Sequence, residues 1–185
     1  MKKIFTFSVL IALAFTSCTD KEKAIDLTPY STKGAEIAKT TQMQLGKNLK
    51  RTMKAKGPVA AVAFCNTKAM PLTAEMEQKY DAKIKRVSNK VRNEANKPNA
   101  TESKIIEDYI NALKNGKEIK PITKVVGEKV HYYAPIKTGG VCLNCHGTTV
   151  AQPIDSILKI KYPNDKALGY AKGDLRGIWS IEMKK

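Results

Sequence analysis

The spacing of apolar residues predicts a helix over residues 32–56, followed by a short buried strand over 59–64. In the first segment, apolar residues recur at every fourth position with lysines between them, which is typical of one helix face. A Gly-Pro pair ends that pattern. The second segment is a continuous apolar run rich in Ala and Val. We therefore expect Cys65, the next residue, at the end of a buried strand.

Beyond Cys65, helix and strand signals alternate. Asn99 with Glu102 three places on is typical of a capping box at the start of a helix. The expected elements are, in order, a helical turn over 71–80, a strand over 84–91, a helix ending at Gly116, a hairpin over 122–133, a helix over 154–160 and a strand over 177–183. The connections are short and no βαβ pattern dominates. This order predicts an α+β domain with an antiparallel sheet.

The first residues have the pattern of an export signal. Two lysines precede a short apolar run, and small residues precede Cys18, an ending that resembles a lipobox. A buried helix with a chance cysteine is the alternative. We expect residues 1–17 to be a signal peptide, 18–32 a tether that is lipid-anchored at Cys18, and 33–185 the domain. The predicted location is the periplasm, on the outer membrane rather than the inner one.

Charge restricts the choice of partner. Without the two signal-peptide lysines, the net charge is about +14, and such a field attracts anions. Export argues against nucleic acid. The basic residues are spread along the whole sequence, so a solvated surface is the simple interpretation and an acidic redox partner the sharper one.

Apolar residues make up 42% of the chain, which suits one domain, and no run reaches the roughly 18 that span a bilayer.

Residues 142–146 read Cys-Leu-Asn-Cys-His and are followed by Gly147. This is the C-x-x-C-H pattern of haem c attachment. Two thiols at this spacing add across two vinyl groups of one porphyrin, and His146 then supplies an imidazole to the iron. A zinc site with Cys65 as fourth ligand, a thioredoxin-like redox pair and a structural disulfide are the alternatives. Export, the adjacent histidine and the absence of a second C-x-x-C favour one covalent haem c.

A six-coordinate iron needs a second axial ligand. Cys65 is otherwise an unpaired thiol in an oxidising compartment, and iron would both use it and protect it. His131 is the other histidine, in an expected strand, and a packed or surface imidazole is its simpler interpretation. The remaining candidates are the methionines Met43, Met53, Met70, Met76 and Met183, which more often fill gaps in a core.

Several segments, in one order, resemble a family of exported PAS-like single-haem c-type cytochromes, the Tll-type haem proteins. They are residues 63–69, 86–88, 91–93, 96–99, the Cys-Leu-Asn-Cys-His-Gly box, 162–167, 169–170 and 173–177. The resemblance covers roughly residues 33–183. It implies a five-stranded antiparallel PAS-like sheet with flanking helices and one haem against one face. This chain would be a lipoprotein member of that family.

The resemblance also bears on individual residues. In that family a cysteine on the first strand can be the distal ligand, and Cys65 occupies the matching place. The expected iron ligands are therefore His146 and Cys65. Arg86 and Arg92 are expected to neutralise the haem propionates, because a guanidinium group pairs well with a carboxylate. The family's usual Arg-Asn-Pro is Arg-Asn-Glu at residues 92–94 here.

Three functions are compatible with such a centre. The first is a redox or gas sensor, in which a thiolate leaves the iron on reduction and opens a site. Its signal must pass to a separate protein, because this chain carries no further signalling domain. The second is a membrane-tethered electron carrier that docks on an acidic redox partner. The third, a haem peroxidase, ranks last, since Cys65 would fill the distal side where acid–base groups are needed. We therefore expect a redox protein that is not an enzyme.

Overall fold

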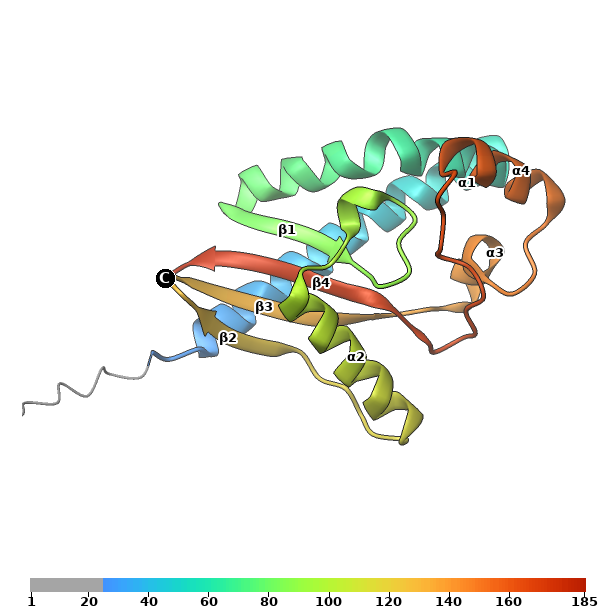
Figure 1. Cartoon of the computed structure of the whole chain (residues 1–185). Helices are drawn as coiled ribbons and strands as arrows, with labels where there is room; N and C mark the ends of the chain where they lie inside the picture. The colour runs from blue at the N-terminus through green and yellow to red at the C-terminus, as the bar shows by residue number, and fades with distance from the viewer. Residues whose placement is uncertain (1–24) are drawn as a thin grey trace, which may run out of the picture.

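A four-stranded antiparallel sheet forms the middle of the protein, whose computed structural model describes residues 25–185 (Figure 1). The strands lie side by side in the order β1 (Ala82–Val87), β4 (Leu175–Lys184), β3 (Lys129–Lys137) and β2 (Ile122–Val126). The predicted hairpin is confirmed as β2 and β3, with Gly127 in the left-handed region (φ 58°) at its turn. The expected α+β class with an antiparallel sheet is likewise confirmed.

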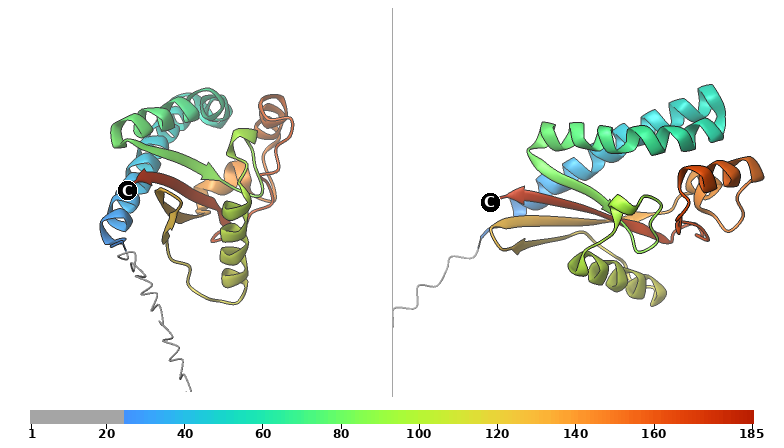
Figure 2. Two further views of the ribbon diagram at one scale, coloured as in Figure 1. Left: turned by 60° about the vertical axis from the view of Figure 1, so that its left-hand side comes forward. Right: turned by 45° about the horizontal axis from the view of Figure 1, so that its top comes forward.

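Helices cover both faces of this sheet (Figure 2). Helix α1 (Thr28–Tyr80) lies on one face and α2 (Ala100–Lys114) on the other. Neighbouring residues of β4 point to opposite faces: Trp179 packs in the core beneath α1 and Ile178 in the core beneath α2. The short α3 (Leu143–His146) and α4 (Gln152–Lys161) lie beyond one end of the sheet, and α4 packs against α1.

The strand expected over residues 59–64 is wrong. Helix α1 is interrupted at Gly57, whose φ of 78° and ψ of 175° are not helical, and its two arms meet there (Figures 1 and 2). Residues 59–64 belong to the second arm, where Val62 packs against α4. Their three alanines are compatible with a helix, and only part of the run is buried. Cys65 therefore lies on a helix. The described sheet has four strands, not the five that the resemblance implied.

The ends of the other elements largely follow the sequence signals. The predicted capping box is confirmed: Glu102 N–H donates to Asn99 Oδ1, and Asn99 N–H donates to Glu102 Oε2, both at 2.8 Å. Helix α1 begins at Thr28, so the last residues of the range expected to be a tether are helical. The predicted signal peptide and Cys18 lie outside the described residues. Within residues 25–185, no helix combines the length and apolar character needed to cross a membrane.

Gly34 lets α1 approach the sheet closely, and an alanine there is expected to destabilise the fold. A Cβ at Gly34 would lie 2.3 Å from the ring of the buried Tyr132. Such overpacking typically costs about 1–3 kcal/mol in the free energy of unfolding. Gly46, also within α1, has no atom within 4 Å of the corresponding position. Gly46→Ala is the matched control and is expected to stabilise by up to about 1 kcal/mol. Urea titration of both variants tests this, and equal midpoints would contradict it.

Candidate functional site

The Cys-x-x-Cys-His segment forms one tight turn at the end of the sheet. A 3₁₀ turn (Gly140–Cys142) leads into α3, so Cys142 and Cys145 stand about one helical turn apart with free thiols. Gly147 N–H closes α3 by donating to Leu143 O at 2.9 Å. A Cβ at Gly147 would lie 2.6 Å from that same oxygen, so only glycine fits. The turn thus holds both thiols beside His146.

His146 is fixed by the segment that follows α4. Its Nδ1 lies 2.8 Å from Ala167 O. A carbonyl oxygen only accepts, so Nδ1 carries the hydrogen and Nε2 keeps its lone pair for a metal. Tyr170 N–H donates to His146 O at 3.0 Å, and the Tyr170 ring stands perpendicular to the imidazole, 6.3 Å between centroids. Burial, together with the charges of Arg92 and Arg176, lowers the pKa of His146 to about 3.

Arg92 connects the segment that follows α4 to the turn of residues 140–146, which we call the thiol turn. Its Nε donates to Asp165 Oδ2 at 2.9 Å, and its Nη2 donates to Cys145 O at 2.6 Å and Ala167 O at 3.4 Å. The ion pair with Asp165 is largely buried, with side chains 12% and 7% exposed. Asp165 Oδ1 also accepts from Ala167 N–H at 2.8 Å. Two of the three guanidinium nitrogens are thus bonded within the protein.

The second arm of α1 brings Cys65 to the same region. Val62, one turn earlier, is buried against α4 in a cluster whose margin includes Cys145. Asn66, the next residue, donates from Nδ2 to Lys161 O of α4 at 3.3 Å. Burial raises the pKa of the Cys65 thiol and nearby Cys145 adds to that effect, whereas Arg86 and Arg92 oppose it. The charges of Cys145, Arg86 and Arg92 all act on the Cys65 thiol, so these residues lie near it.

A cavity of about 160 Å³ adjoins His146. Its wall includes Arg86, Arg92 and Arg176. Burial lowers the pKa values of Arg86 and Arg176, and each of the two is repelled by another arginine of this wall. Arg86 lies 5.9 Å from the Trp179 ring, whereas Arg176 Nη1 donates to Lys90 O at 3.1 Å. Both guanidinium groups are half-buried, and a partly desolvated cation is stabilised by an anion as partner.

Two side chains and one backbone group of this site were missed in the sequence. Asp165 and Arg176 fall within segments that carry the family resemblance, but nothing in the local pattern assigns them a role. Asp165 acts on Arg92, which is 73 residues away in sequence. Ala167 contributes only its carbonyl oxygen to His146, and the identity of a side chain gives no signal for that.

The other distal-ligand candidates lie elsewhere. His131 is near the start of β3, where it pairs with Glu182 of β4, and its Nε2 is 3.9 Å from Glu182 Oε2. Lys137, at the far end of the strand, is six positions further along, about 20 Å away. Met76 and Met183 pack in the core beneath α1, and Met43 and Met70 are exposed; the half-buried Met53 is in the first arm of α1.

Two of the alternatives to haem can be compared with this geometry. Zinc in a structural site needs about four converging ligands. In residues 25–185, no three His, Cys, Asp or Glu side chains converge as a metal site. Cys65, Cys142 and Cys145 are all free thiols, so no disulfide joins the pair. The site offers a donor set of two adjacent thiols, one imidazole with a free Nε2 and a nearby third thiol.

Fold and site together define an α+β domain in which a C-x-x-C-H turn faces a helical hairpin among half-buried arginines. More specifically, the chain belongs to the Tll0287-like family, whose sequence profile, named for Tll0287, matches residues 22–184. This confirms the family that the sequence segments indicated. The structure is similar to the crystal structure of the cyanobacterial heme-protein Tll0287, with a TM-score of 0.66 and 20% identity. That match covers 85% of this chain and 96% of the other. No curated protein matches this chain.

Proposed function

We propose that this chain is a c-type cytochrome that holds one haem through thioether bonds at Cys142 and Cys145. His146 would bind the iron through Nε2, and Cys65 would be the second axial ligand. The observation that carries this proposal is the arrangement of the donors: two free thiols and an oriented neutral imidazole on one turn, with Cys65 in the same buried neighbourhood. Such a group supplies one-electron redox chemistry and a site for small gases.

The arginines divide into two roles under this proposal. Arg86 has no ion pair within residues 25–185, and Arg176 bonds only a carbonyl and lies over the Tyr170 ring, 5.4 Å from its centroid. Both are available for the propionates. Arg92 was expected to bind a propionate as well, but its bonds to Asp165 and Cys145 O make it a positioning residue for the thiol turn. Arg176 therefore replaces it in our assignment.

The biological role we propose is a redox or gas sensor. The two proposed iron ligands come from separate elements, because Cys65 belongs to the long hairpin α1 and His146 to α3. Loss of the bond to Cys65 would remove one link between the second arm of α1 and the thiol turn, and a shift of that arm is what a separate signalling protein would detect. This supports a sensor whose output is the position of α1.

An absorption spectrum and a denaturing gel test the haem assignment. Protein produced with a working cytochrome-maturation system should be coloured and keep its haem on the gel, because thioether bonds survive denaturation. Carbon monoxide, which binds ferrous haem, should bind the reduced protein if Cys65 leaves on reduction. Colourless protein would contradict the covalent haem. Colour without binding of carbon monoxide would contradict the sensor role and favour an electron carrier.

The distribution of charge favours electron carriage as a second candidate function. Residues 37–74 contain seven basic residues and no Asp or Glu. We call this segment the basic hairpin; all seven are exposed, and none has an ion pair within the described part of the chain. The tip of the hairpin at Gly57 is eight residues, or about 12 Å along the helix, from Cys65. An acidic redox protein would thus dock close to the proposed haem.

Charge reversal at the basic hairpin is expected to slow electron exchange with an acidic protein. For Lys50→Glu/Lys54→Glu, the rate of reduction by a reduced [2Fe–2S] ferredoxin at low salt should fall about tenfold, because electrostatic steering is lost. The control Lys117→Glu/Lys120→Glu carries the same charge change beyond α2. Stopped-flow absorbance measures both. Equal slowing in both pairs would show that net charge matters and the hairpin does not.

We also propose that residues 1–17 export the chain and that Cys18 carries lipid, with the domain in the periplasm at the outer membrane. The support is the sequence pattern alone: a basic start, an apolar run and small residues before the cysteine. Metabolic labelling with palmitate should mark the protein and not the Cys18→Ala variant. Equal labelling of the two would contradict the anchor.

A further inference from the structure

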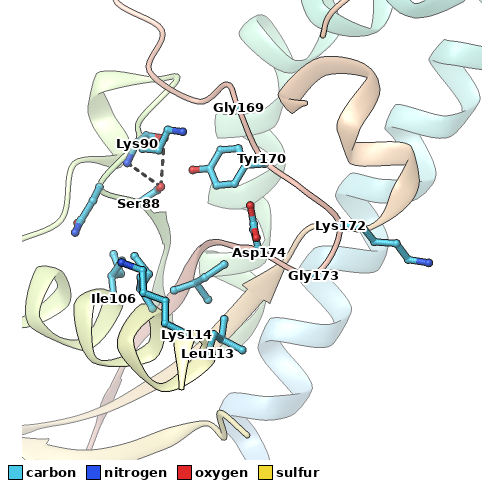
Figure 3. A pocket seen from close by; sticks show the side chains of 13 residues that line it. Ser88, Lys90, Ile106, Leu113, Lys114, Gly169, Tyr170, Lys172, Gly173 and Asp174 are labelled. Carbon is cyan, nitrogen blue, oxygen red and sulfur yellow. Dashed lines mark hydrogen bonds between the residues drawn. The ribbon is translucent and has the colours of Figure 1, made fainter. Parts of the chain in front are cut away.

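A second pocket lies on the face of the sheet that α2 covers, between α2 and the segment that precedes β4 (Figure 3). Its volume is about 570 Å³, within the range of small-molecule sites. The apolar part of its lining comes from both elements: Ile106, Ile110 and Leu113 of α2, and Leu175 of β4. Ile110 and Leu113 are only half-buried. The pocket therefore offers apolar surface that the fold itself does not cover.

The polar part of the lining is cationic on balance. Lys114, one residue beyond Leu113, has no ion pair within residues 25–185, and Lys90 lies 4.5 Å from the centroid of the Tyr170 ring. The carboxylate of Asp174 already accepts from Ala171 N–H at 2.7 Å, which binds it to its own loop. Figure 3 shows Lys172 directed away from the pocket. Lys90 Nζ already donates to Leu168 O, so Lys114 is the ammonium group left for an anion.

We propose that this pocket binds an organic monoanion with an apolar chain, such as a medium-chain carboxylate. The apolar body would lie on the side chains of α2 and Leu175, and burying that surface supplies the affinity. The carboxylate would lie toward Lys114. Neither this ligand class nor this face of the sheet is part of the haem site proposed above.

The wall of the pocket is also the segment that holds His146. Tyr170 lines the pocket, and its N–H donates to His146 O. Gly169 N–H donates to Gly147 O at 2.9 Å, directly beside it. A ligand that displaces the Tyr170 ring would therefore alter how His146 is held. This second step rests on the proposed function, and it would make the pocket an input to the same sensor.

Isothermal titration of the haem-loaded protein with decanoate tests the site. We expect saturable binding at one site, weakened about tenfold for decanol, which lacks the charge. Ile110→Glu should weaken decanoate binding at least about tenfold, and Lys114→Gln about threefold. Ile160→Glu, at a residue 72% exposed on α4, is the matched control and should bind as the wild type does. Thermal unfolding checks that each variant is folded.

The outcomes distinguish binding in the pocket from its effect on His146. Absence of saturable binding, or unchanged affinity in folded Ile110→Glu, overturns the pocket assignment. Binding that leaves the absorption spectrum of the reduced protein unchanged overturns the link to His146 and keeps the pocket. Colourless protein that still binds decanoate overturns the haem proposal alone, because titration needs no haem signal.

Discussion

Replacing Cys65 by serine is expected to change the ferric absorption spectrum and to raise the reduction potential by on the order of 100 mV, within the roughly 0.8 V that axial ligands can set. A thiolate gives electron density to iron and stabilises the ferric state. Serine has nearly the same shape but is a poor ligand. Spectroelectrochemical titration of the haem-loaded protein measures both quantities.

The matched control is His131→Ala, which should leave the spectrum and the potential unchanged. His131 lies near the other end of β3, beside Glu182 and with its ring stacked on Tyr133, 5.9 Å between centroids. No rearrangement short of unfolding the sheet would bring it to His146. If His131→Ala changed the spectrum and Cys65→Ser did not, the distal-ligand assignment to Cys65 would be wrong.

The parts of the fold that the sequence predicts correctly depend on local chemistry. The hairpin of β2 and β3 follows from two β-rich runs and Gly127, and the start of α2 follows from Asn99 and Glu102. The thiol turn is predictable for the same reason, since Cys142 to Gly147 form a contiguous motif. In each case the residues that determine the structure are within a few positions of one another.

The features that the sequence does not predict depend on distant parts of the chain. A short apolar run such as 59–64 is compatible with a buried strand or a helix, and its packing against α4 decides between them. That packing joins residues nearly a hundred positions apart. The propionate partner suggested for Arg92 stays a prediction, but its ion pair with Asp165, far along the chain, has no local signal in the sequence. Cys65 still reaches the expected neighbourhood, although on a helix and not a strand.

Removing the carboxylate of Asp165 is expected to cause a large loss of stability. Asp165→Ala leaves the buried guanidinium of Arg92 without its counter-charge and Ala167 N–H without an acceptor. Breaking a buried pair on one side typically costs about 3–5 kcal/mol in the free energy of unfolding. Urea unfolding of the haem-loaded protein, followed by circular dichroism, measures this cost.

Asp155→Ala on α4 is the control, because its ion pair with Lys159 is surface-exposed, with side chains 33% and 77% accessible. Such pairs contribute at most about 1 kcal/mol. If Asp165→Ala cost no more than Asp155→Ala, Arg92 would not depend on its carboxylate partner. The double variant Arg92→Ala/Asp165→Ala sharpens the test, since it removes both charges and should lose less than the two single variants combined. Strict additivity would show that Arg92 and Asp165 stabilise the thiol turn independently, through Cys145 O and Ala167 N–H and not through each other.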